Sequence, residues 1–164
     1  MDRRALLCSV GTLSATSAAG CLDSLEPGRT STSTPTTTLG WLSAKNFDTA
    51  QGHTIELRVE RDGEVVHTSS QTLEEKSGQG ILGAVADCTW DTVPGEYVVF
   101  ARADDGKWTQ RTLTAPFESP PECVVVSVRY GGPTHVDPED PLAVVVDDQC
   151  EEIDEFVGGC PEYR

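Results

Sequence analysis

The cysteines and histidines are the residues of this chain with the most distinctive chemistry. Four cysteines follow residue 40: Cys88, Cys123, Cys150 and Cys160. Structural zinc sites draw their ligands from closely spaced pairs such as C-x2-C or H-x3-H, and the sequence has no such pair. A blue-copper centre needs two histidines, a thiolate and usually an axial methionine, but the one methionine is Met1. We therefore expect two disulfides, with no metal site and no cofactor.

The preferred disulfide pairing is Cys123 with Cys150 and Cys88 with Cys160, although four cysteines allow three pairings. Cys123 begins one valine-rich run and Cys150 follows another, so a hairpin made of the two runs brings these cysteines together. Alternation along the strands places them on opposite faces, however. A bulge or a strand end near Asp147 must correct this before a disulfide can form.

Motifs for nucleophilic or metal-assisted hydrolysis are absent from the sequence. It contains neither a G-x-S-x-G elbow nor an H-E-x-x-H pair. In both motifs a fixed spacing places the reactive side chains where they can act. Carboxylates are abundant, but among 27 acidic residues close pairs arise without any catalytic role. We expect no catalytic activity, and an unrecognised secreted enzyme remains an alternative.

The densest group of carboxylates lies near the C-terminus, within nine residues that contain no base. Its members are Asp147, Asp148, Glu151, Glu152, Asp154 and Glu155. Carboxylate oxygens at short spacing suit Ca²⁺, but this stretch lacks the alternating ligands and central glycine of an EF-hand loop. We expect a solvated loop without a specific metal site. A divalent-cation-binding module is the alternative function.

Three tryptophans raise the question of a binding surface. Trp90 stands two residues after Cys88 and is expected in the core, whereas Trp108 follows a turn and is expected to lie over Arg102 across a hairpin. Exposed aromatic rings form platforms for carbohydrates or peptides. Packing is the favoured role for these rings, with a cell-surface protein or glycan as a possible partner.

Charge excludes one class of partner. The formal net charge is -15, from 27 acidic and 12 basic residues. Affinity for nucleic acid depends on neutralising phosphates with Lys and Arg, so nucleic acid is not expected to bind. A large acidic excess with few lysines resembles proteins of halophilic archaea, in which concentrated salt screens the mutual repulsion of the charges.

The N-terminal residues have the pattern of an export signal. Arg3 and Arg4 precede a mildly apolar stretch, and Ala18-Ala19-Gly20 stands immediately before Cys21. This stretch resembles a twin-arginine signal joined to a lipobox, although a lipobox usually has leucine where Ala18 stands. The resemblance implies cleavage after residue 20 and a lipid on Cys21, which would anchor the protein on the extracytoplasmic face of the membrane.

The segment 21–40 is rich in Thr, Ser and Pro and is expected to be a disordered tether. A leader followed by such a tether is similar to surface lipoproteins of haloarchaea, and the stretches 88–108 and 121–126 are similar to β-sandwich lipoproteins of the same group. The similarity specifies location only, and it implies no catalytic residues. The function expected from it is a structural or binding role at the cell surface.

From residue 41 to residue 164 the apolar residues recur with period two. The stretch 55–60 alternates apolar and charged residues before an Asp62-Gly63 turn, which predicts a hairpin. Counting back from this turn pairs Val59 with Val66 and directs His67 outward. Further hairpins are expected about Asp105-Gly106 and between the two valine runs. About seven short strands without an amphipathic helix predict an all-β, antiparallel immunoglobulin-like β-sandwich.

Overall fold

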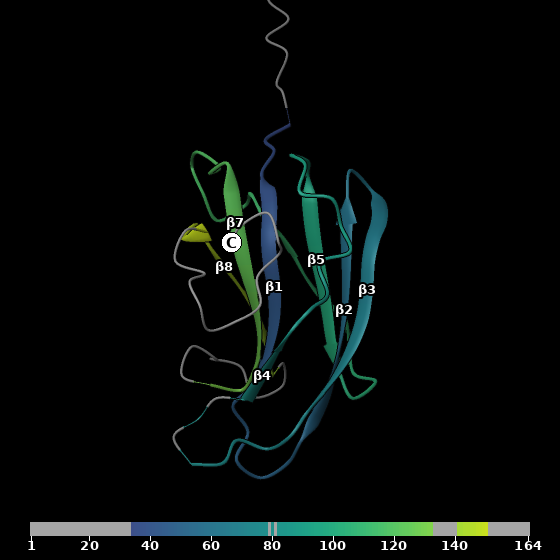
Figure 1. Ribbon diagram of the computed structural model, residues 1–164, viewed down its shortest axis with the longest axis vertical. Coiled ribbons are helices and arrows are strands. Elements are labelled where there is room, and N and C mark those ends of the chain that lie inside the picture. The colour runs from purple at the N-terminus through teal and green to yellow at the C-terminus, as the bar shows by residue number, and fades with distance from the viewer. Residues whose placement is uncertain (1–33, 79, 81, 133–140, 151–164) are drawn as a thin grey trace, which may run out of the picture. The chain divides into compact units, whose positions relative to one another are not determined.

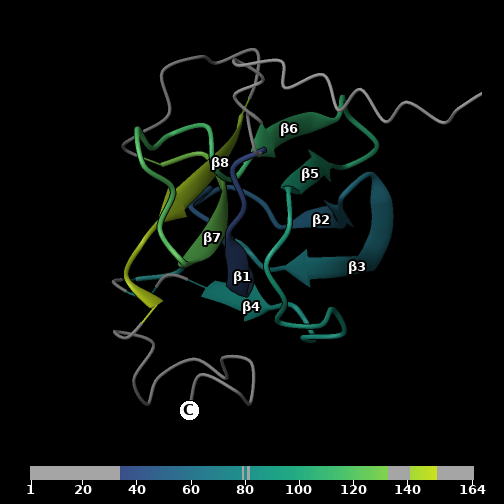
Figure 2. The same ribbon diagram turned by 90° about the horizontal axis from the view of Figure 1, so that it is seen from above.

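The computed structural model describes residues 34–78, 80, 82–132 and 141–150, and in these residues the chain forms eight β-strands and no α-helix. The strands are β1 (Thr38–Asn46), β2 (His53–Arg61), β3 (Glu64–Leu73), β4 (Leu82–Val85), β5 (Tyr97–Ala103), β6 (Thr109–Thr112), β7 (Cys123–Tyr130) and β8 (Leu142–Asp147). They form two four-stranded sheets with strand orders β4-β1-β7-β8 and β3-β2-β5-β6. Figures 1 and 2 show the two sheets facing each other as the layers of a sandwich.

The period-two pattern explains why these segments pack as a sandwich. Along β2, Ile55, Leu57 and Val59 are buried, while the intervening charged residues lie on the outer face. The inward residues of β7 pack against them from the other sheet in the same hydrophobic core. Burial of apolar side chains stabilises the fold by about 25 cal/mol for each Å² removed from water. The predicted all-β sandwich is confirmed.

One strand pair departs from the expected antiparallel arrangement. Strand β1 pairs with β7 in parallel, with Ser43 beside Ser127 and Ala44 beside Val128. A parallel pair needs a long connection between its strands, and the whole β2–β6 segment lies between β1 and β7. The first sheet is therefore mixed, and the strand count is eight.

Strand β1 also begins earlier than expected. Its first residue is Thr38, three residues inside the segment that was expected to be tether, and the Thr38 amide donates a hydrogen bond to the Glu122 carbonyl at 2.8 Å. The pairing of β1 with β7 is irregular between Leu39 and Trp41. A Cβ atom on the intervening Gly40 would lie only 2.9 Å from the Cys123 sulfur. Glycine is therefore required where the backbone of β1 passes the sulfur.

The hairpin formed by β2 and β3 corrects the prediction for His67. The turn residues Asp62 and Gly63 have φ of 54° and 82°, as the expected two-residue turn requires. The register then shifts between Val59 and Glu60, so that Val59 pairs with His67 rather than with Val66. A bulge adds one residue to β3 and reverses the facing of the residues beyond it. His67 is therefore buried and points inward, not outward.

The structure confirms the first predicted disulfide. Cys123 is bonded to Cys150, with 6.2 Å between their Cα atoms. The problem of facing is solved by a strand end, because β8 ends at Asp147 and a turn carries Cys150 back, its amide donating to the Asp148 carbonyl at 3.0 Å. Cys88 is also disulfide-bonded. Its expected partner, Cys160, lies outside the described residues.

Candidate functional site

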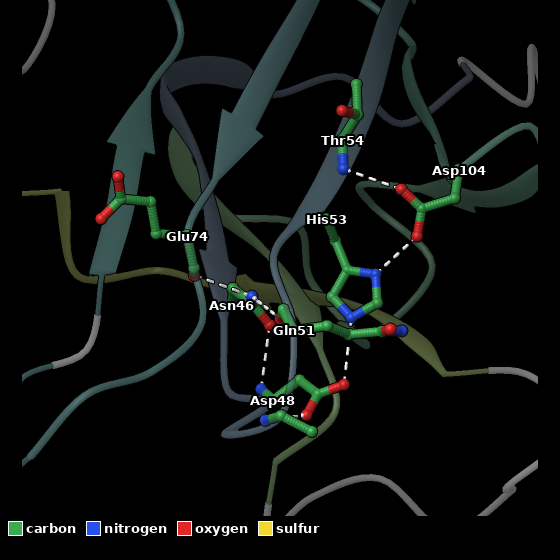
Figure 3. Close-up of polar contacts among 8 residues, drawn as sticks. Asn46, Asp48, Gln51, His53, Thr54, Glu74 and Asp104 are labelled. Carbon is green, nitrogen blue, oxygen red and sulfur yellow. Dashed lines mark hydrogen bonds and ion pairs between the residues drawn. The ribbon is translucent and has the colours of Figure 1, made fainter.

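The first candidate site is a buried histidine held between two carboxylates at one end of the sandwich (Figure 3). His53 is the first residue of β2, and its side chain is fully buried. Its Nδ1 lies 2.5 Å from Oδ2 of Asp104, and its Nε2 lies 3.1 Å from Oδ2 of Asp48. The imidazole also stacks on the ring of Tyr130, with 3.6 Å between centroids. We call these four residues the His53 cluster.

The loops that carry the two carboxylates are fixed by local hydrogen bonds. Asn46, fully buried at the end of β1, donates to the carbonyls of Gln51 and Glu74 and accepts from the Asp48 amide. Asp104 has φ of 47° in the β5–β6 turn, a left-handed conformation that Asp tolerates better than most residues. The centre of this turn is Asp104-Asp105 rather than the expected Asp105-Gly106.

The contacts of the His53 cluster hold the β1–β2 loop and the β5–β6 turn against the start of β2. Each imidazole nitrogen lies within hydrogen-bonding distance of a carboxylate oxygen, so neither nitrogen is directed toward a substrate. The pKa of Asp48 is lowered by hydrogen bonds from the Ala50 amide and from His53. Burial alone would raise the pKa of Asp104, but hydrogen bonds from His53 and the Thr54 amide outweigh it and lower that pKa. The cluster therefore favours both carboxylates in their charged form.

Acid is expected to weaken the fold through this cluster. Because the two carboxyl pKa values lie below the unfolded value of about 3.9, their stabilising effect is complete above about pH 4 and is lost as the pH falls through the folded values. The variant Asp48→Asn with Asp104→Asn should therefore lose less stability than the wild type between roughly pH 5 and pH 2. Denaturation midpoints across this range measure the difference. The charge-matched variant Glu75→Gln with Glu118→Gln should follow the wild type. Equal losses of stability toward low pH in all three proteins would contradict the stabilising role of the charged Asp48 and Asp104.

The second candidate site is a cleft of about 390 Å³ on the outer face of the β3-β2-β5-β6 sheet. Its volume lies within the range of roughly 300–1,000 Å³ found for small-molecule sites. We call it the Trp108 cleft. It is lined by Glu56, Leu57, Arg58, Thr68, Ser69, Ser70 and Trp108.

Strand register explains how these side chains come together. Arg58 of β2 lies between Thr68 of β3 and Phe100 of β5. One step of two residues along β2, Glu56 lies between Ser70 and Arg102. Alternate residues of a strand share a face, so the two rows present hydroxyl, charged and aromatic groups on the same outer surface.

Trp108 lies over this surface just before β6. Its ring centroid is 4.9 Å from the guanidinium carbon of Arg102 and 5.4 Å from that of Arg58, and Arg58 also lies 4.1 Å from the centroid of Phe100. The predicted contact of Trp108 with Arg102 is confirmed. Each such cation–π contact contributes about 0.5–1 kcal/mol at an exposed position. Trp108 nevertheless keeps 42% of its surface exposed.

Ion pairs neutralise both guanidinium groups. Arg102 donates to both carboxylate oxygens of Glu56 at 2.8 and 2.9 Å, and Arg58 lies 3.3 Å from Glu60. The bidentate bond to Glu56 raises the pKa of Arg102. Asp105 is a third carboxylate beside these two arginines, with its Oδ1 3.8 Å from Arg102, so this part of the face has no excess of positive charge.

Sequence reasoning placed Trp90 correctly but missed the members of the cleft. Trp90 is buried in the core as expected, and Trp41 packs against the core in a partly buried position. Arg58 and Glu56 were recognised only as the outward residues of a strand. Their alternation with apolar residues on β2 indicated that they face outward. Their neighbours on β3 and β5 could not be identified without the register of the strand pairs.

Several expected site residues cannot be placed. Arg3, Arg4 and Cys21 lie outside the described residues, as does the acidic segment beyond Cys150. Of that segment, Asp147 and Asp148 are described, and Asp147 accepts a hydrogen bond from the Gln149 amide. Within the part of the chain that the structure describes, no three His, Cys, Asp or Glu side chains are grouped to hold a metal ion.

Comparison of the chain with protein-family models, with curated proteins and with solved structures finds no match. The class of the protein is therefore given by its fold, which is an all-β sandwich of two four-stranded sheets. No helix in the described ranges is long and apolar enough to cross a membrane.

Proposed function

We propose that this protein is a lipid-anchored, extracytoplasmic binding domain without catalytic activity, and that it recognises a cell-surface component in the Trp108 cleft. The observation that carries the proposal is an exposed tryptophan over two arginines beside a cleft lined by hydroxyl groups. Exposed aromatic side chains with a few polar groups around them are typical of binding sites.

The alternatives find less support in the geometry. In the His53 cluster both imidazole nitrogens are engaged by carboxylates, so this histidine lacks the free nitrogen that a general base requires. The cation-binding alternative rests on residues that lie largely outside the described part of the chain. The Trp108 cleft is solvent-accessible and contains groups of varied hydrogen-bonding character.

The anchor is the second component of the proposal. It rests on the sequence pattern of Arg3, Arg4 and the small residues before Cys21. Acylation of Cys21 and cleavage after residue 20 would hold the domain at the outer membrane surface through the Thr-rich segment. Stable anchoring by acyl chains generally takes two signals, which a doubly lipidated N-terminal cysteine would supply.

One set of variants in the native host tests both components. The wild type should partition with membranes and form cross-links to a surface component when treated with a membrane-impermeant reagent in molar NaCl. Cys21→Ser should leave the membrane fraction or remain unprocessed. Trp108→Ala should stay in the membrane fraction but lose the cross-links.

The control is Val93→Ala, which also truncates an exposed apolar side chain, at 45% exposure, but outside the cleft. It should behave as the wild type in both measurements. An intact mass that shows unmodified Cys21 on a retained leader would refute the anchor. Unchanged cross-linking of Trp108→Ala would refute the binding face.

A further inference from the structure

We infer that the ligand of the Trp108 cleft is a neutral saccharide, recognised through one or a few uncharged sugar rings. This inference rests on the binding function proposed above and specifies its ligand. Four properties of the cleft lead to it: its two unlike walls, its mixture of hydrogen-bonding groups, the pairing of its arginines with carboxylates, and the restraint of its side chains.

The two sides of the cleft differ in chemistry. On one side, β3 contributes the hydroxyl groups of Thr68 and Ser70, and on the other stands the indole ring of Trp108. Strand β2 lies between them in the sheet order and supplies Glu56 and Arg58. A sugar ring has a matching division, because its C–H bonds form an apolar face and its hydroxyl groups project from the rim. The apolar face would stack on the indole while the rim faced β3.

Hydrogen-bonding capacity points to the same ligand class. Hydroxyl groups both donate and accept, a carboxylate accepts and a guanidinium donates. The cleft presents all three kinds of group within one small volume. A sugar hydroxyl can use such a mixture, whereas a ligand carboxylate only accepts and a ligand ammonium only donates.

Charge argues against an ionic ligand. Both arginines of this face are paired with glutamates, Arg102 with Glu56 and Arg58 with Glu60. An anion would have to compete with Glu56 and Glu60 for the arginines and would be repelled by the net negative chain. A cation would have to approach the two guanidinium groups. A neutral polar ligand meets neither obstacle, and its binding would depend little on salt.

The groups that line the cleft are also held in place before a ligand binds. Its polar groups stand on the paired strands β2 and β3, and the stacked side chains of Phe100, Arg58 and Trp108 restrain one another. Tryptophan has only two side-chain torsions, so its ordering costs little entropy. Groups that are already in place bind with a smaller entropic loss. This smaller loss favours a small polar ligand such as a sugar, which buries little apolar surface on binding.

The test uses the full chain and an array of neutral, uronic-acid-containing and sulfated oligosaccharides, in low and in molar NaCl. We expect binding to neutral oligosaccharides that persists in molar salt. For the tightest of these, titration should show that Trp108→Ala weakens binding about tenfold or more, equivalent to about 1.4 kcal/mol or more. Ser70→Ala should weaken it a few-fold, and Val93→Ala should leave it unchanged.

Two results would overturn the inference. Binding confined to acidic oligosaccharides and lost in molar salt would show that charge, not stacking, recognises the ligand. Absence of any oligosaccharide binding, with cross-links to a protein lacking glycans that still depend on Trp108, would replace the saccharide with a peptide surface. In that second case the proposed binding function stands, whereas loss of the Trp108-dependent cross-links themselves would refute both.

Discussion

Replacing Trp90 with alanine should lower the free energy of unfolding by about 3–5 kcal/mol, the cost of removing a large aromatic side chain from a core. Trp90 is 4% exposed, its Nε1 donates to the Leu39 carbonyl at 2.9 Å, and its ring meets the edge of His67 with 5.0 Å between centroids. Alanine would leave a cavity between the sheets and an unsatisfied carbonyl on β1. Denaturant unfolding of both proteins in the same salt measures the change.

Two further variants separate the contributions of Trp90. Trp90→Phe keeps most of the ring but loses the hydrogen bond, so its cost should be smaller, about 1–3 kcal/mol for a buried acceptor left unpaired. Val93→Ala, at a nearby exposed position, should stay within about 0.5 kcal/mol of the wild type. A loss below about 1 kcal/mol for Trp90→Ala would mean that this ring does not hold the two sheets together.

Removal of the Cys123–Cys150 disulfide should have the second largest effect. The bond closes a separation of 27 residues, for which loss of chain entropy in the unfolded state gives about 3–4 kcal/mol. It also ties the start of β7 to the chain that follows β8, next to Gly40 of β1. The variant Cys123→Ser with Cys150→Ser should therefore unfold at a markedly lower denaturant concentration than the oxidised wild type.

Peptide mapping of the oxidised protein is the companion measurement. It should recover Cys123 linked to Cys150, and it also tests the prediction that Cys88 is linked to Cys160. A peptide that joins Cys150 to Cys160 would disprove both pairings. A stability loss below about 1 kcal/mol in the double serine variant would show that the native contacts, not the bond, close this end of the sheet.

Local features of the sequence were sufficient to predict the fold class. Alternation at period two along 55–60, the Asp62-Gly63 turn and the two valine runs identified strands and hairpins, and the structure contains them. These signals depend on a residue and its near neighbours, so they can be read without the tertiary fold. The expected core position of Trp90 and the pairing of Cys123 with Cys150 followed from the same reading.

Features that depend on which strands become neighbours were decided only by the tertiary structure. The bulge at Val66 turned His67 inward, because one extra residue on β3 reverses every later side chain. The parallel pairing with β7 drew Thr38 and Gly40 into β1, although their surroundings in the sequence are those of a tether. Neither event leaves a local signal, since each depends on contacts with distant residues.

The two candidate sites show the same division. His53 and Asp48 are five residues apart, but Asp104 is 51 residues from His53 and reaches it only across the sheet. In the Trp108 cleft the outward positions of Glu56 and Arg58 were evident from alternation on β2. Their partners on β3 and β5 were determined by strand order and register, which arise from packing the whole core at once.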